Sequence, residues 1–228
     1  MSHTYSLDKI KTLQHHNMAI IGGFMGGYAL LMRCDILANA QTMNLIQLVL
    51  AALGRNFTDV LFRIPVIIFY FAGGYLFVCI SHLFEPYVRF VGLAIDAFVL
   101  LLLGFLPADC RPIVALYPIF FAMAYQWNAF SGSEGYVCST IFSTNNIRQI
   151  SLALGAYTFE RDRRYLKKAA YFFQTILCFH LGVAIAWLLT GLYQTRGGWP
   201  AILILLPALG MEIGIYKALK PGTKKVFV

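Results

Sequence analysis

The chain has 228 residues, of which 59% are hydrophobic and only 12% are charged, with a formal net charge of +8 at pH 7. Soluble domains carry about 25% charged residues, so this composition excludes a water-soluble globular fold and predicts an all-α, polytopic transmembrane helical bundle. The apolar runs are continuous and about twenty residues long, which excludes a β-barrel. The basic residues form short flanking clusters, which favours contact with the lipid bilayer and its anionic head groups and argues against nucleic-acid binding.

Taken in chain order, six stretches are predicted to cross the membrane, and two further apolar stretches contain polar clusters. The six clear spans are predicted at 17–33, 60–82, 88–107, 112–130, 169–192 and 199–217. The two polar stretches are 36–54 and 137–157, and each is expected either to span or to be a discontinuous, re-entrant element. If both span, the bundle has eight crossings and parallel repeats; if both re-enter, it has six crossings and inverted repeats. The distribution of Lys and Arg slightly favours eight.

This pattern divides the chain into four parts. They are a cytoplasmic tail (1–16), a first transmembrane repeat (17–107), a second transmembrane repeat (112–217) and a basic cytoplasmic tail (218–228). The basic clusters before the first span and after the last predict that both termini are cytoplasmic, in a multi-pass protein of the plasma membrane.

The two polar stretches contain the same sequence pattern. Residues 42–54 read TMNLIQLVLAALG and residues 144–155 read TNNIRQISLALG. At a separation of 102 residues the matching pairs are Thr42 and Thr144, Asn44 and Asn146, and Gln47 and Gln149. Further along, Gly74 aligns with Gly182. Polar side chains are unfavourable in hydrocarbon, so a polar cluster that occurs at corresponding points of two halves predicts a binding site near the midplane.

The candidate substrate-binding residues are the polar side chains of these stretches and of the span that precedes the second one. They are Thr42, Asn44, Gln47, Gln126, Ser143, Thr144, Asn146, Arg148 and Gln149. Side-chain amides donate and accept hydrogen bonds, so they suit a polar solute, and Arg148 favours an anionic one. The same amides also join helices inside membranes, and this second interpretation stays open.

Three further residues are candidates for proton transfer or for a charge pair. Asp96 and Glu212 are the two most deeply placed acids, and either is expected to pair with Arg148 or to carry protons. For His180, a packed, hydrogen-bonded side chain is favoured over a role as a proton relay. The chain has no GxSxG, HExxH, P-loop or dinucleotide motif, so an enzyme, a metal site and a cofactor are not expected.

Two runs of the sequence resemble the paired motifs of the YoaK family, which are bacterial multi-pass membrane proteins of unknown function. The first run extends from Gly23 to Asn44 and contains ANAQTMN; the second leads from Met123 to Arg148 and contains STNNIR. The resemblance covers about residues 17–217 and implies a protein of the bacterial inner membrane. Where the family has an aspartate in its first helix, this chain has Gly26 or Gly27. Where the family has a glycine in each of the two turns, this chain has Met43 in the first and Asn145 in the second.

These observations predict a small secondary transporter or permease for a small polar or anionic solute. Its site would lie at the repeat interface, where the paired polar segments meet. The alternative is a non-transporting membrane subunit or scaffold in which the same residues serve helix packing. With either function, association into a homo-oligomer is an open expectation. The two functions differ in whether the polar segments line a wet cavity or a dry contact.

Overall fold

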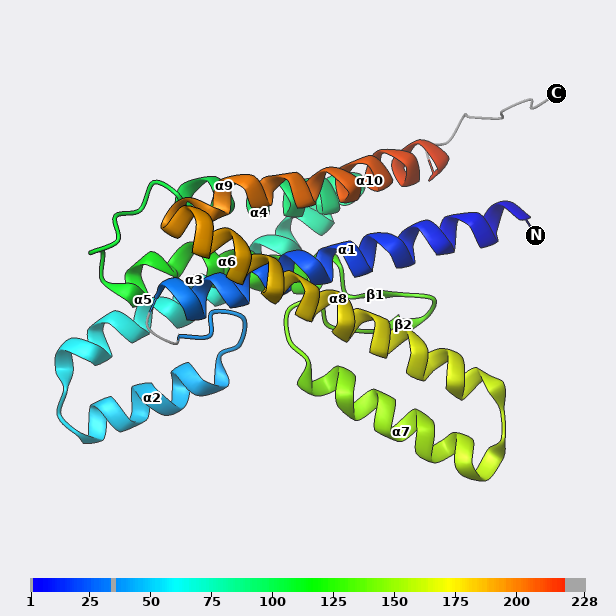
Figure 1. The fold of residues 1–228 in the computed structure, drawn as a ribbon, viewed down its shortest axis with the longest axis horizontal. Helices are drawn as coiled ribbons and strands as arrows, with labels where there is room; N and C mark the ends of the chain where they lie inside the picture. The colour runs from blue at the N-terminus through cyan, green and yellow to red at the C-terminus, as the bar shows by residue number, and fades with distance from the viewer. Residues whose placement is uncertain (1, 34–35, 220–228) are drawn as a thin grey trace.

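The computed structural model describes residues 2–33 and 36–219. This part of the chain is helical apart from its connections and one short antiparallel hairpin (Figure 1). In chain order the elements are α1 (Ser2–Met32), α2 (Thr42–Leu53), α3 (Phe57–Leu83), the 3-10 helix η1 (Glu85–Tyr87), α4 (Val88–Leu103), α5 (Pro112–Ala115), α6 (Tyr117–Ala129), β1 (Gly132–Ser133), β2 (Tyr136–Val137), α7 (Thr144–Glu160), α8 (Arg163–Tyr193), η2 (Gln194–Gly197), α9 (Gly198–Ala201), η3 (Ile202–Ile204) and α10 (Leu205–Leu219). Cys34 and most of the predicted basic tail, 218–228, lie outside the described residues.

The segment predicted as a cytoplasmic tail, 1–16, is helical from Ser2 and continues without a break into the first predicted span. Its polar side chains contact the rest of the molecule. Gln14, only 1% exposed, donates a hydrogen bond to Glu212 of α10 at 2.8 Å, and Thr12 donates to Glu134 beside the hairpin at 2.9 Å. These contacts stabilise the helix where the sequence alone is too polar to predict a buried element.

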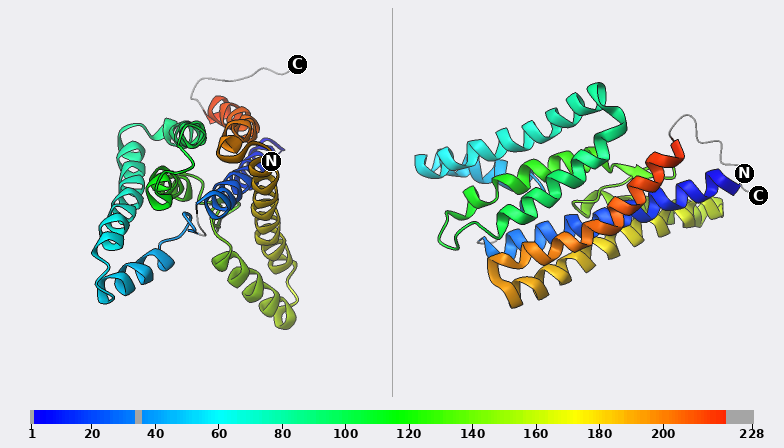
Figure 2. Two further views of the ribbon diagram at one scale, coloured as in Figure 1. Left: turned by 60° about the vertical axis from the view of Figure 1, so that its left-hand side comes forward. Right: turned by 90° about the horizontal axis from the view of Figure 1, so that it is seen from above.

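The helices form two bundles, each of which combines helices from both predicted halves. α1 packs along α8 and against α10, whereas α6 packs along α3 and against α4. The left view of Figure 2 separates these groups, with α3, α4 and α6 on one side and α1, α8 and α10 on the other. The first helix of each predicted half therefore packs against the long third helix of the other half.

Close approach of α1 to α8, and of α6 to α3, depends on glycine. A Cβ atom at Gly182 of α8 would lie 2.0 Å from the carbonyl oxygen of Ile20, and one at Gly73 of α3 would lie 2.2 Å from that of Phe121. Contacts this short leave no room for any side chain, so each glycine allows two backbones to meet directly. Gly73 occupies this position in α3, one residue before the Gly74 that the sequence alignment matched with Gly182.

Helices α2 and α7 lie outside the two bundles and form hairpins with α3 and α8. Both begin at matching residues, Thr42 and Thr144. An arginine in the left-handed conformation follows each helix: Arg55, with φ 57°, lies two residues after the end of α2, and Arg161, with φ 56°, directly follows α7. In Figure 1 the two helices leave the middle of the molecule in opposite directions. They therefore have corresponding places in the two halves and opposite orientations.

The ends of the helices establish that α1 and α4 run in the same direction. Arg89, at the start of α4, donates to Gln14 in the first half of α1 at 3.3 Å. Arg33, directly after α1, donates to the carbonyl of Pro107, beyond the end of α4, at 3.0 Å. Between the end of α1 and the start of α4, the chain must therefore cross back to the end of the molecule at which α1 begins. The long helix α3 makes this return.

Candidate functional site

A groove of about 630 Å³ lies where the two polar segments approach each other. It is lined by residues on both sides of the two helix starts, and by aromatic side chains of α3, α6 and α8. The lining residues are Leu37, Ala40, Gln41, Thr42, Leu45, Tyr70, Trp127, Ile141, Phe142, Ser143, Thr144 and Phe179. The structure therefore brings the matching residues Thr42 and Thr144 to one groove.

The starts of α2 and α7 offer uncapped backbone N–H groups at this groove. Neither Gln41, before α2, nor Ser143, before α7, makes a side-chain hydrogen bond that caps its helix. The first N–H groups of a helix have no partner within the helix and carry a partial positive charge. Two such helix starts at one groove favour an anion or a solute with several acceptor oxygens.

The backbone segments that precede α2 and α7 are held together by a buried amide. Asn39 is fully buried, and its Nδ2 donates to the carbonyl oxygens of Gly22 at 2.8 Å and Ile141 at 2.7 Å. These two bonds join α1, the segment before α2 and the segment before α7. Asn39 lies in the ANAQTMN run but is not one of the predicted site residues, because nothing in the neighbouring sequence indicates what its side chain contacts.

The matching asparagines Asn44 and Asn146 each hold the segment before their own helix. Asn44 Nδ2 donates to the carbonyl of Ala40 at 3.0 Å. Asn146 Nδ2 donates to the carbonyl of Ser139 at 2.8 Å, and its Oδ1 accepts from the Ser139 N–H at 3.2 Å. Both side chains are buried, at 2% and 1% exposure. Their amide groups therefore stabilise the non-helical backbone on which the groove is built.

Gln126 of α6 has a similar supporting position. It is fully buried, and its Nε2 donates to Thr140 Oγ1 at 2.9 Å and to the carbonyl of Met18 at 3.1 Å. These bonds tie α6 to α1 and to the segment before α7. Gln126 thus holds α1, α6 and the segment before α7 together, but it is not one of the residues that line the groove.

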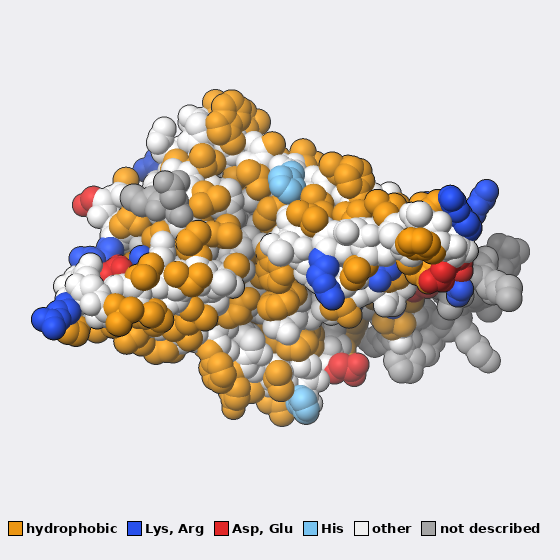
Figure 3. Space-filling view, turned by 90° about the horizontal axis from the view of Figure 1, so that it is seen from below, with side chains coloured by type: hydrophobic (Ala, Val, Ile, Leu, Met, Phe, Trp, Pro, Cys, Tyr) orange, Lys and Arg blue, Asp and Glu red, His pale blue; other side chains and the backbone are white. Residues whose placement is uncertain are grey.

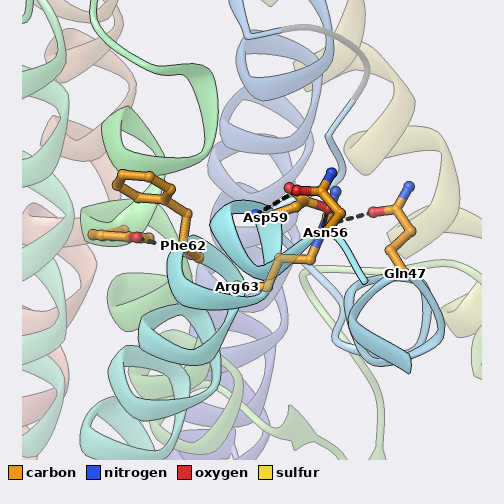
Figure 4. Close-up of polar contacts among 6 residues, drawn as sticks. Gln47, Asn56, Asp59, Phe62 and Arg63 are labelled. Atoms are coloured by element: carbon orange, nitrogen blue, oxygen red, sulfur yellow. Dashed lines mark hydrogen bonds and ion pairs between the residues drawn. The ribbon is translucent and has the colours of Figure 1, made fainter. Parts of the chain in front are cut away.

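Gln47 connects α2 to α3 through an arginine that the sequence did not indicate. Arg63 donates from Nη1 to Gln47 Oε1 at 2.7 Å and from Nε to Asp59 Oδ2 at 2.7 Å. Figure 4 shows the guanidinium between the carboxylate on its own helix and the amide of α2. Asn56 caps the same helix, because its Oδ1 accepts from the Asp59 N–H at 3.1 Å. These contacts fix the orientation of α2 relative to α3.

The predicted pairing of Arg148 with an intramembrane acid is not found among the described residues. Arg148 is exposed on α7. Glu212 instead accepts from Gln14 at 2.8 Å and lies 3.8 Å from Arg89. Asp96 is fully buried in α4, and neither of its carboxylate oxygens has a hydrogen-bond partner. Among the described residues Arg148 pairs with neither acid, because α7 lies outside both the bundle that contains Asp96 and the bundle that contains Glu212.

The remaining candidates lie apart from the buried core. Gln149 is half-buried on α7, and His180 is exposed on α8, where its Nδ1 lies 2.8 Å from the carbonyl oxygen of Ile176 in its own helix. The groove therefore contains three of the predicted residues, Thr42, Ser143 and Thr144. Among the residues that the structure describes, no group of three His, Cys, Asp or Glu side chains could hold a metal ion.

The fold and its surface define the class of protein. In the described part of the chain, three helical stretches are long and apolar enough to cross a membrane: Phe57–Leu83, Glu85–Leu103 and Arg163–Leu219. Figure 3 shows a face that is largely hydrophobic, with most Lys and Arg side chains gathered at its two ends. An apolar band between charged ends is what a helical membrane protein presents to lipid.

Comparison with known families agrees with this class. Residues 15–211 match the family described as "Protein of unknown function (DUF1275)", and the chain belongs to that family. No curated protein and no solved structure matches the chain.

Proposed function

We propose that this protein is a small secondary transporter of the plasma membrane, and that the groove between the starts of α2 and α7 binds its solute. The observation that carries the proposal is the convergence of two helix starts with matching sequences, Thr42 and Thr144, on one groove. Discontinuous helices that meet at the interface of two repeats form the solute sites of many transporters. The resemblance to the YoaK family is compatible with a transporter but does not indicate which solute is transported.

The arrangement of the helices supports six crossings and inverted repeats. α2 has 12 residues, a length of about 18 Å against a hydrocarbon core of about 30 Å. α7 is longer, with 17 residues, but both helices begin at the groove in the interior of the molecule, so we propose that both re-enter rather than span. The corresponding helices of the two halves run in opposite directions (Figure 1), as an in-plane pseudo-two-fold axis requires. This version replaces the eight crossings that the Lys and Arg distribution slightly favoured.

The charges at the two ends support a cytoplasmic location of both termini. One end of the molecule carries the start of α1, the turn between α7 and α8 and the end of α10 (Figure 1). Its basic residues are Lys9, Lys11, Arg89, Arg161, Arg163, Arg164, Lys167, Lys168 and Lys217. At the opposite end they are Arg33, Arg55, Arg111 and Arg196, while Arg63 in α3 and Arg148 in α7 lie within helices between the two ends. The more basic end is the cytoplasmic one by the positive-inside rule.

The groove favours a small anion or a neutral solute rich in acceptor oxygens. The uncapped helix starts supply N–H donors, and Thr42, Ser143 and Thr144 supply hydroxyl groups. Among the described residues that line the groove, none is acidic. Hydrogen bonds from oriented N–H groups hold anions without a buried counter-charge.

A second candidate is a non-transporting membrane subunit. It is favoured by the buried amides, because Asn39, Asn44, Asn146 and Gln126 all use their donors on backbone or side-chain groups of the protein itself. In that case the duplicated polar segments are a packing device. The two candidates make different predictions for the hydroxyl groups of the groove.

The test is solute binding by the purified protein in lipid nanodiscs, measured by calorimetry with a panel of small inorganic and organic anions. We expect one class of anion to bind, and the double variant Thr42→Val, Thr144→Val to bind it at least about tenfold more weakly. The matched control is Thr158→Val on α7, an exposed threonine that hydrogen-bonds only to the Leu154 carbonyl of its own helix. Unchanged affinity in the double variant would reject the site. No binding by any anion, or by neutral solutes rich in acceptor oxygens measured in the same way, would favour the non-transporting subunit.

A further inference from the structure

A second cavity, of about 690 Å³, lies at the end of the molecule where α1 begins. It opens between the two bundles, and its walls come from α1, α3, α4, α6 and α10 together with the turn before α4. The lining residues are Lys11, Phe77, Ser81, Glu85, Pro86, Val88, Arg89, Ala129, Glu212, Ile215, Tyr216 and Leu219. None of these residues lines the groove between α2 and α7, so the two cavities are separate.

The wall of this cavity contains a charge pair that joins the two bundles loosely. Arg89 of α4 and Glu212 of α10 approach to 3.8 Å between Nη1 and Oε2. A close charge-assisted hydrogen bond is about 2.7–2.9 Å long. Gln14 of α1 fills the gap, because its Nε2 donates to the same Glu212 oxygen at 2.8 Å and its Oε1 accepts from Arg89 at 3.3 Å. The two charges are therefore held near each other without satisfying each other fully.

Both charged groups retain hydrogen-bonding capacity that faces the cavity. A guanidinium has five N–H donors, and the hydrogen bond and ion pair of Arg89 use Nη1 alone. The Arg89 side chain is 28% exposed and lines the cavity, so its other nitrogens are accessible to a ligand there. The hydrogen bond from Gln14 and the ion pair with Arg89 both involve Oε2 of Glu212, and the residue lines the cavity. A ligand in the cavity can reach one donor group and one acceptor group at the same time.

The charges of the lining select the ligand class. Lys11 and Arg89 would repel a simple cation, and Glu85 and Glu212 would repel a simple anion. A molecule that carries an anionic group beside an ammonium group meets both signs with favourable contacts. Apolar side chains such as Phe77 and Ile215 are available for a hydrophobic body.

We propose that this cavity binds a small zwitterionic group, with its anionic end on Arg89 and its ammonium on Glu212. The group can belong to a free amino acid or to the head group of phosphatidylethanolamine, since both place an ammonium near an anion. The proposal concerns a cavity other than the groove, so it stands or falls independently of the transport function.

The experiment uses the full chain in nanodiscs of phosphatidylcholine, whose quaternary ammonium has no N–H to donate to Glu212. Binding of leucine is measured by calorimetry and by the midpoint of thermal unfolding. Two half-molecules serve as probes: 4-methylpentanoate, which lacks the ammonium, and 3-methylbutylamine, which lacks the carboxylate. We expect leucine to bind and both half-molecules to bind at least about tenfold more weakly.

A second arm replaces phosphatidylcholine by phosphatidylethanolamine. A rise in the unfolding midpoint that Glu212→Gln removes identifies the lipid head group as the zwitterion, whereas leucine binding in phosphatidylcholine identifies a free amino acid. Failure of both arms overturns the proposal. So does equal binding of 4-methylpentanoate and leucine, because that result describes a simple anion site.

The variants locate the site. Arg89→Gln and Glu212→Gln are each expected to weaken zwitterion binding at least about tenfold, while Arg55→Gln, an exposed arginine at the opposite end, is expected to leave it unchanged. If Arg89→Gln does not fold, Arg89→Lys keeps the charge and removes the planar fork, and it should still bind more weakly than the natural protein. Undiminished binding in both Arg89 variants would assign the ligand to another place.

Discussion

The side-chain amide of Asn39 donates a 2.7 Å hydrogen bond to the main-chain carbonyl of Ile141. These residues are 102 positions apart, the same separation that relates Thr42 to Thr144. The contact therefore joins corresponding points of the two polar segments, just before the helices that follow them. It explains why both helix starts reach one groove, because the two backbones are tied together immediately before α2 and α7 begin.

Replacing Asn39 by Ala should destabilise the protein by about 2 kcal/mol, since the carbonyls of Gly22 and Ile141 both lose the hydrogen bond from this fully buried amide. Thermal unfolding in nanodiscs measures the loss. The control is Asn145→Ala, a half-buried residue next to the matched Asn146, which should change stability by less than about 0.5 kcal/mol. Equal effects of the two variants would contradict a bridging role for Asn39.

Gly182→Ala should be among the more damaging small substitutions in α8. The added methyl group would lie 2.0 Å from the Ile20 carbonyl oxygen and 2.8 Å from the Phe24 nitrogen, so α1 and α8 must separate, at a cost of about 1–3 kcal/mol. Gly191→Ala, in the same helix, meets no atom within 4 Å and should be neutral or stabilising by up to about 1 kcal/mol. A shared melting temperature for the two variants would show that α1 and α8 do not pack as described.

The contact between Gln47 and Arg63 should restrain α2. Arg63→Gln removes the 2.7 Å bonds to both Gln47 and Asp59, and amide hydrogen exchange in residues 42–53 is expected to rise several-fold. Gln47→Ala should raise the same exchange, and the double variant should add little to Arg63→Gln, because both changes break one interaction. Fully additive effects would mean that the two side chains act separately.

Asp96→Leu should stabilise the fold. The natural side chain buries a carboxyl group whose two oxygens have no hydrogen-bond partner, and an unpaired buried polar group costs about 1–3 kcal/mol. Asp109→Leu, which changes an exposed acid, is expected to have little effect. If Asp96→Leu is more stable yet inactive in a solute-binding or uptake assay, the acid is retained for function; a loss of stability would instead reveal a partner that the fold depends on.

The start of α8 should respond to acid. Asp162 accepts hydrogen bonds from Arg164 Nε at 2.7 Å and from the Arg164 N–H at 2.8 Å, and these bonds lower the pKa of its carboxyl below the usual 3.8. A depressed pKa in the folded state gives stabilisation that is present above pH 3.8 and is lost as the pH falls through the lowered pKa. Hydrogen exchange of the first turn of α8, corrected for intrinsic rates, should therefore be constant from about pH 7 to 5 and rise below about pH 4.

Asp162→Asn provides the matched variant for this acid response. Asn is also a good helix N-cap but does not titrate, so the rise in exchange below about pH 4 should disappear while the helix start persists. An acid response that survives the substitution would have to come from another group.

Local features of this protein follow closely from its sequence. The starts of α2 and α7 at Thr42 and Thr144 coincide with the duplicated motif, and α3 and α8 contain the apolar runs predicted at 60–82 and 169–192. Such features depend on short-range physics, namely the apolar length needed to cross hydrocarbon and the residues that begin or interrupt a helix. The break at Leu116 between α5 and α6 is of the same kind, because Pro118 has no N–H to continue the helix.

Contacts between distant elements required the tertiary structure. Composition indicated that Glu212 needs a partner, but the partner is Arg89, paired through Gln14, and not Arg148. The choice depends on the depth at which each residue lies and on which bundle its helix joins, and residues far apart in sequence acquire those positions only when the helices pack. The sequence by itself thus determined a membrane protein with two matching polar segments. Only packing decided that the segments are joined by the hydrogen bond from Asn39 to Ile141 and that the helices that follow them point in opposite directions.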